Sequence, residues 1–204
     1  MAYPTIDAPY GFRPVNLLGG QVFAGSTRQM AIASGHATNI FFGDIVIMSA
    51  NGCINNATLT DSAVQVAGIF MGCSYINSSS QRVFGQYYPA TITQTVDSAN
   101  GTVAFVADDP DLVMKVAVVS GTTTMSGKDR AGLVGATAAW VANAGSTITG
   151  DSKQAILSTT GTATTLPLKV IDVVPDTVNS ANSFTEVLVT WTGLVHMYRG
   201  AAGI

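Results

Sequence analysis

Charged residues are scarce in this sequence. Asp, Glu, Lys and Arg make up 10% of the 204 residues, whereas ordinary soluble domains contain about 25%. The nine basic residues are spread from Arg13 to Arg199 without forming a cluster. The sequence therefore lacks the electropositive stripe that neutralises phosphates, and we expect no nucleic-acid partner. Such a weakly charged surface favours contact with other protein.

Glutamate is rarer still, because Glu186 is the only Glu among the 12 acidic residues. Asp favours turns and caps, whereas Glu favours helix interiors. Threonine occurs 24 times, often inside apolar alternations, and this pattern is typical of pleated sheet. The composition therefore predicts a β-rich chain with little helix.

Cysteines and long apolar runs are nearly absent. Cys53 and Cys73 are the only two thiols, which are too few to complete a zinc site. We interpret them as small buried hydrophobes, with a disulfide as the alternative. No window of about 20 residues is both apolar and free of Gly, Asn and Ser, and prolines interrupt the N-terminal segment. We therefore expect neither a secretory signal nor a membrane partner.

What the chain does contain is a series of short apolar, β-branched runs. Two of them lie in residues 102–119, separated by an acidic turn around Pro110. Proline breaks any helix across this point, and each run is too short for an amphipathic helix. We therefore predict a hairpin with its turn near residues 107–111. Lys115 lies on the opposite face of the second strand from its apolar side chains, so that face should be partly covered or close to a sheet edge.

The order of these runs predicts one all-β domain, either a sandwich or barrel-like, over residues 22–199. Residues 1–21 contain three prolines and three aromatics and are expected to form an extended arm, while residues 200–204 form a C-terminal tail. A helical turn is expected only at residues 128–133. The arm either folds back on its own sheet or docks on a neighbouring subunit. Aromatic and Arg side chains make good interface anchors, so the candidate binding residues are Tyr3, Pro4, Tyr10, Phe12 and Arg13.

Candidate chemistry is sparse. Asp108, Asp109 and Asp111 lack the spacing of a calcium-binding EF-hand and fit turn chemistry around the proline. His36 and His196 have no His or Cys at ligand spacing, so we expect one loop His and one strand-end His. No nucleophile elbow or phosphate-binding glycine loop is present. We therefore expect no enzyme activity, no metal and no cofactor.

Five short patches occur along the chain in a characteristic order. They are DAPYGFRPV at 7–15, GD at 43–44, ADDPDL at 107–112, GSTITG at 145–150 and LPLKV at 166–170. Together they resemble the head decoration, or cement, proteins of tailed bacteriophages. The closing segment GLVHMYRGAAGI, residues 193–204, departs from that pattern.

The resemblance implies a β-rich protein on the outer surface of an icosahedral virion. Such a protein binds between subunits of the major capsid protein, often as a homotrimer, and stabilises the shell without an active site. We therefore expect a virion structural protein whose partners are the major capsid protein and itself. The alternative is a structural protein associated with the tail or a fibre. A secreted carbohydrate-binding sandwich is disfavoured, because Trp140 and Trp191 are isolated in sequence.

Overall fold

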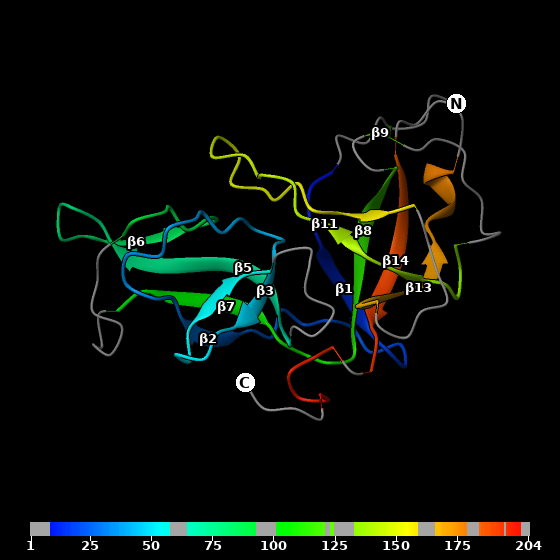
Figure 1. The fold of residues 1–204 in the computed structure, drawn as a ribbon, viewed down its shortest axis with the longest axis horizontal. Helices are drawn as coiled ribbons and strands as arrows, with labels where there is room; N and C mark the ends of the chain where they lie inside the picture. Colours follow the sequence, from blue (N-terminus) through cyan, green and yellow to red (C-terminus); the bar gives the residue numbers. More distant parts are fainter. Residues whose placement is uncertain are drawn as a thin grey trace.

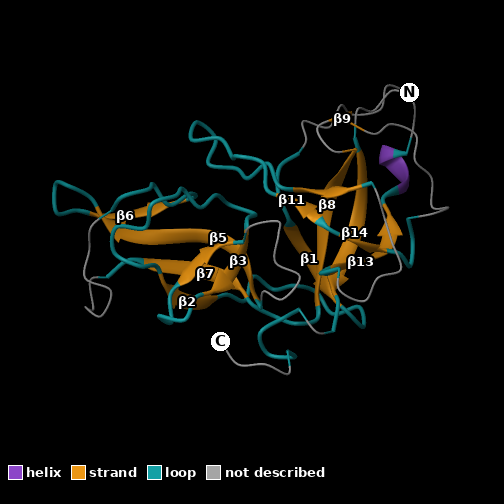
Figure 2. Ribbon diagram, viewed as in Figure 1, coloured by secondary structure: helices purple, strands orange, loops and turns teal. Residues whose placement is uncertain are grey.

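The computed structural model describes residues 9–57, 65–92, 101–120, 123–124, 133–158, 166–178, 184–193 and 195–200. They form two β-sheets that lie side by side along the longest axis of the molecule (Figures 1 and 2). The described residues contain one helical element, the 3-10 turn η1, Pro175–Thr177. The prediction of an all-β fold with little helix is therefore confirmed. The helical turn expected at 128–133 lies, apart from Leu133, outside the described residues.

One sheet, here called the barrel sheet, has eight strands and is centred on β8. Its main path runs in the order β10 (Thr137–Ala138), β13 (Leu168–Val173), β14 (Thr185–Trp191), β8 (Leu112–Ser120), β12 (Ala155–Leu157) and β11 (Trp140–Val141). Two further strands, β1 (Arg13–Leu17) and β9 (Thr123–Thr124), also pair with β8.

The barrel sheet is nearly closed. Its two end strands, β10 and β11, belong to one continuous segment, residues 137–141. One part of this segment pairs with β13 and the other with β12, and the Leu157 amide donates to the Ala139 carbonyl at 2.9 Å between them. The segment therefore joins the two ends of the sheet, as in a barrel.

The other sheet, here called the second sheet, has six strands. Its path runs β2 (Arg28–Ala31), β7 (Val103–Ala107), β5 (Val66–Ile76), β3 (Ile45–Met48) and β4 (Ile54–Asn56), and β6 (Arg82–Gly85) pairs with β5. A single bridge between Ile32 and Ile54 links its two end strands. The second sheet therefore curls back on itself as well.

The prediction of a hairpin in residues 102–119 is wrong, although both predicted strands, β7 and β8, are present. β7 pairs with β2 and β5 in the second sheet, whereas β8 pairs with β1, β14 and β12 in the barrel sheet. The acidic turn between them carries the chain from one sheet to the other. A short connection allows a hairpin but does not require one, because the pairing is decided by which strands bury each other's side chains.

The periodicity of β8 was predicted correctly. Its alternate residues Leu112, Met114, Val116 and Val118 all have 0% exposure and point into the core. Lys115, on the opposite face, keeps 37% of its side chain exposed and pairs with Glu186 at 3.2 Å. This face is therefore partly covered. The sheet-edge alternative does not apply, because β8 lies in the interior of its sheet.

The two sheets share a hydrophobic core. The main cluster contains Ile45, Ile69 and Ala107 from the second sheet together with the inward side chains of the barrel sheet. A second cluster, which includes Met30 and Phe70, covers the other face of the second sheet. The sheets are therefore joined by packing as well as by the chain.

The start of the chain differs from the expected arm over residues 1–21. Residues 13–17 form β1, which pairs with β8 across a bulge between Pro14 and Asn16. Phe12 has 0% exposure and belongs to the main core. This segment is therefore part of the barrel sheet, because its apolar side chains bury more surface there than an extended arm would. Residues 1–8 and 201–204 lie outside the described residues.

The structure agrees with the interpretation of the two cysteines as small buried hydrophobes. Cys53 and Cys73 are both buried, and neither forms a disulfide bond. Burial raises the pKa of the Cys73 thiol to about 12, so this thiol stays protonated and behaves as a small apolar group.

Candidate functional site

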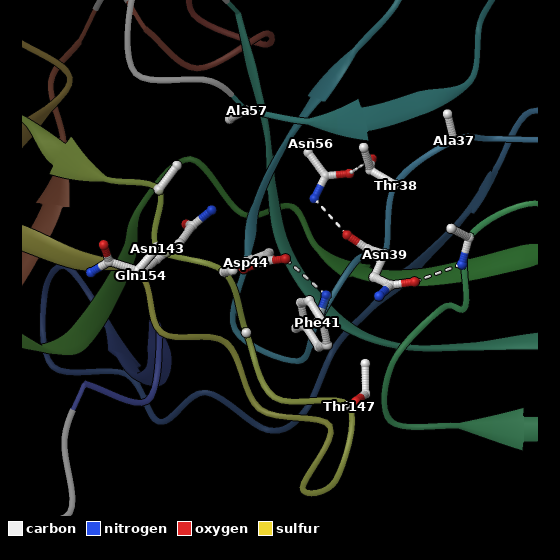
Figure 3. Close-up of a pocket in the computed structure, with 14 residues that line it drawn as sticks. Ala37, Thr38, Asn39, Phe41, Asp44, Asn56, Ala57, Asn143, Thr147 and Gln154 are labelled. Atoms are coloured by element: carbon white, nitrogen blue, oxygen red, sulfur yellow. Dashed lines mark hydrogen bonds between the residues drawn. The ribbon is translucent and has the colours of Figure 1, made fainter.

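An open groove of about 440 Å³ lies between the second sheet and residues 142–150, which are part of the loop that connects β11 to β12 (Figure 3). The groove draws its walls from four separate parts of the chain, within residues 37–44, 56–57, 90 and 142–154. The lining residues include Ala37, Asn39, Asn56, Ala90, Ala144 and Thr147. In Figure 1 the loop is the yellow-green segment that projects from the barrel sheet.

Asp44 lies at the floor of the groove and is only 3% exposed. Gly43 adopts φ +92, a conformation that favours glycine, and turns the chain so that Asp44 folds back on Phe41. The Phe41 amide donates to Asp44 Oδ2 at 2.8 Å, and the Asp44 amide donates to the Phe41 carbonyl at 2.9 Å. Burial raises the pKa of the Asp44 carboxyl to about 6, against the opposing effect of hydrogen bonds from Ser152 and Phe41. Asp44 therefore holds the turn together.

The amide side chains around the groove bond within the protein. Asn39 Oδ1 accepts from the Ala90 amide at 2.7 Å, and Asn56 Nδ2 donates to the Asn39 carbonyl at 3.0 Å. Gln154 Oε1 accepts from the Ile45 amide at 2.9 Å. These bonds fix the walls of the groove, and five alanines and Gly145 form the small apolar part of its lining.

The loop beside the groove is firmly braced at its base. The Phe42 amide donates to the Gly150 carbonyl at 3.0 Å, and the Ser152 amide donates to the Phe42 carbonyl at 3.0 Å. Gly145 packs so closely on Phe41 that an added Cβ would lie 2.4 Å from the ring. Beyond this base, Ile148 is 95% exposed. The loop therefore presents an apolar side chain on a rigid support.

The two histidines show no catalytic arrangement in the described part of the chain. His36 Nε2 lies 3.1 Å from Asn56 Oδ1 and 2.9 Å from Thr38 Oγ1. His196 is fully buried, its Nδ1 accepts from the Tyr198 amide at 3.4 Å, and burial lowers its pKa to about 4. Among the described residues, no three His, Cys, Asp or Glu side chains gather as metal ligands would.

The acidic link between the sheets follows turn chemistry, as predicted. The Asp111 amide donates to Asp109 Oδ1 at 2.8 Å. Asp108 accepts from Arg28 Nε at 2.5 Å and from the Tyr198 hydroxyl at 2.7 Å. The link is therefore tied to β2 on one side and to the C-terminal segment on the other.

Three of the candidate binding residues, Tyr10, Phe12 and Arg13, make contacts within their own chain. The Tyr10 hydroxyl donates to Glu186, and burial together with this carboxylate raises the pKa of Tyr10. Arg13 pairs with Asp151 at 2.6 Å, and its guanidinium lies 4.3 Å from the Phe42 ring centroid.

These contacts change the expectation for the N-terminal segment. Phe12 has no exposed surface, so it cannot act as an anchor between chains. Tyr10 and Arg13 are half-buried: Tyr10 holds the segment to β14 through Glu186, and Arg13 holds it to Asp151 in the loop between β11 and β12. Their role in contacts between chains stays a prediction. Tyr3 and Pro4 lie outside the described residues.

Sequence reasoning missed the groove and Ile148. The groove is assembled from residues about 100 positions apart, and no local pattern marks such a site. A weak signal for the exposed side chain was present, because Ile148 stands alone between Thr147 and Thr149 in a loop bounded by Gly145 and Gly150.

Comparison of the chain with protein-family models, curated proteins and solved structures finds no match. Within the described residues, there is no helix with the length and apolar character needed to cross a membrane. The class of protein is therefore defined by the fold alone, as an all-β chain with one nearly closed sheet and a second curled sheet.

Proposed function

We propose that the chain is a structural protein of a phage virion. It binds between major capsid protein subunits on the outer surface of the shell, as a homotrimer, and stabilises the shell without catalysing a reaction. The ordered patches that resemble cement proteins support this proposal, together with the character of the described surface.

The observation that carries the proposal is how the surface divides its charged and apolar side chains. Four cations are each paired with an acidic side chain of the same molecule, in Arg13–Asp151, Arg28–Asp108, Lys115–Glu186 and Arg199–Asp111. Large apolar side chains, in contrast, protrude from an edge strand and a turn, with Phe84 73% and Ile148 95% exposed. Such a surface suits adhesion to protein through many shape-matched contacts.

Binding to capsids lacking this polypeptide tests the proposal. Purified protein is mixed with such capsids, and the bound fraction is measured by co-sedimentation. We expect saturable binding at a fixed ratio to the major capsid protein and a higher temperature of shell disassembly. Intact tails from the same phage serve as the matched control. Binding to tails alone would favour the tail-associated alternative, and binding to neither particle would contradict both.

A further inference from the structure

The groove between the second sheet and residues 142–150 offers little to an anionic ligand. None of the described residues that line it is basic, so it provides no cation for a phosphate or carboxylate. The side-chain oxygens of Asn39, Asn56 and Gln154 already accept hydrogen bonds from the protein. The remaining lining is rich in alanine, including Ala37, Ala90 and Ala144. An apolar side chain is the occupant that this lining suits best.

The same chain supplies an apolar side chain of the required kind at the rim of the groove. Ile148 directly follows Thr147, which lines the groove, yet it is 95% exposed and so does not occupy the groove of its own molecule. Full exposure of an isoleucine forgoes the free energy that burial would provide. The hydrogen bonds between Phe42 and residues 150 and 152 hold the base of the loop in place. Little ordering entropy is therefore lost when its tip is buried by a partner.

We infer that Ile148 of one molecule inserts into this groove of a neighbouring copy of the chain. The loop forms one wall of the groove and also carries the inserted residue, so one surface provides both halves of the contact. Repeating the contact by rotation gives every copy one inserted Ile148 and one filled groove. The net charge of −3 is small and opposes self-association only weakly. This inference rests on the proposed function for its expectation of a trimer, and it names the surface through which the copies meet.

The first experiment measures the mass of the purified protein by light scattering. We expect the unaltered protein, at tens of micromolar, to have two or three times the chain mass of 21.0 kDa, with three copies matching the proposed trimer. Ile148→Ser should shift the mass towards that of a single chain. Val22→Ser is the matched control, since Val22 is 80% exposed and does not line the groove. It should leave the mass unchanged.

The second experiment locates the contact with a mixed disulfide. Protein carrying Ile148→Cys is mixed with protein carrying either Ala37→Cys or Ala144→Cys, both exposed groove positions. A covalent dimer of two different chains should form under mild oxidation, and more of it than when Val22→Cys replaces Ile148→Cys. The native thiols add little background because Cys53 and Cys73 are buried.

The outcomes separate this inference from the proposed function. A monomeric unaltered protein, or Ile148→Ser with unchanged mass, would overturn the inference. If Ile148→Ser and Val22→Ser both lower the mass measured by light scattering, the mixed-disulfide experiment decides. A disulfide yield above the Val22→Cys background supports the inference, and a yield no higher than that background overturns it. All of these measurements use purified chain without capsids. Failure here with intact capsid binding therefore leaves the proposed function standing.

Discussion

At the scale of single residues, Asp44 and His196 are two buried titratable groups with opposite effects on stability. Burial raises the pKa of Asp44 to about 6, so the folded state holds this proton more tightly than the unfolded chain. Burial lowers the pKa of His196 to about 4, although the nearby Asp108, Asp109 and Asp111 act in the other direction. The folded state therefore releases the His196 proton more readily.

Proton binding is linked to folding, and this linkage fixes the sign of each group's contribution to the free energy of unfolding. The Asp44 contribution is fully present below the ordinary carboxyl pKa of about 3.9 and is lost as pH rises through about 6. The His196 contribution is present above the ordinary imidazole pKa of about 6.5 and is lost as pH falls towards 4. Each contribution is on the order of 3 kcal/mol. Because they change in the same pH range, they largely offset each other in the unaltered protein.

Replacing either Asp44 or His196 alone should reveal the pH dependence of stability that the other residue causes. We expect the free energy of unfolding of Asp44→Asn to fall between pH 7 and pH 4, because the loss of the His196 contribution is then no longer offset by Asp44. Asparagine keeps an oxygen for the Phe41 amide, so this variant should be more stable than the unaltered protein above pH 6. His196→Gln should show the opposite slope and gain stability on acidification. Urea unfolding at pH 4.5 and 7.5 measures both slopes, and slopes of the same sign in the two variants would contradict this account.

Sequence reasoning reached the local chemistry of such residues but not their environment. The turn role of Asp108, Asp109 and Asp111 was predictable, because Asp next to Pro110 bonds to nearby backbone amides. The burial of Asp44 was not, since Ser152 and Gln154, which border it, lie more than 100 residues away. A pKa shift caused by burial depends on tertiary packing, which a single sequence does not reveal.

At the scale of elements, the sequence predicted most strands but not their partners. Alternation identified the buried face of β8. Alternation does not say which strand lies alongside. β8 pairs with β14, about 70 residues later, while its neighbour in sequence, β7, pairs with β5 and β2. These choices depend on long-range packing that outweighs the short connection.

One such long-range pairing depends on a glycine. Gly68 in β5 lies so close to β7 that an added Cβ would be 2.2 Å from the Ala107 carbonyl oxygen. We expect Gly68→Ala to lower the free energy of unfolding by about 3 kcal/mol, since the two strands must separate to admit the methyl group. Thermal unfolding followed by circular dichroism measures the loss.

Gly193→Ala is the matched control for this substitution. Gly193 has no heavy atom within 4 Å of an added Cβ and is exposed, so its substitution should change stability by less than about 0.5 kcal/mol. Equal effects of the two substitutions would contradict the close approach of β5 and β7.

At the scale of the whole molecule, the N-terminal segment links the two sheets. The Phe12 amide donates to the Gly43 carbonyl at 2.9 Å next to the second sheet, and its ring lies in the main core. Gly11 packs against Ser152, where an added Cβ would be 2.5 Å from the Ser152 Cβ. A segment rich in proline and aromatics was predicted as an extended arm that either folds back on its own sheet or docks on a neighbouring subunit. Composition alone cannot tell a segment that packs on its own protein from one that packs on another. Truncation through residue 14 should therefore disturb the fold.

The shared core predicts that both sheets unfold together. We expect a single calorimetric transition for the unaltered protein, because residues of both sheets pack in the main cluster. Phe12→Ala should lower the free energy of unfolding by about 3 to 5 kcal/mol and shift that whole transition to lower temperature. Phe84→Ala, the same substitution at a side chain that is 73% exposed, should change stability by no more than about 0.5 kcal/mol. Two separate transitions, with Phe12→Ala shifting only one of them, would show that each sheet folds on its own and that the segment around Phe12 stabilises just one of them.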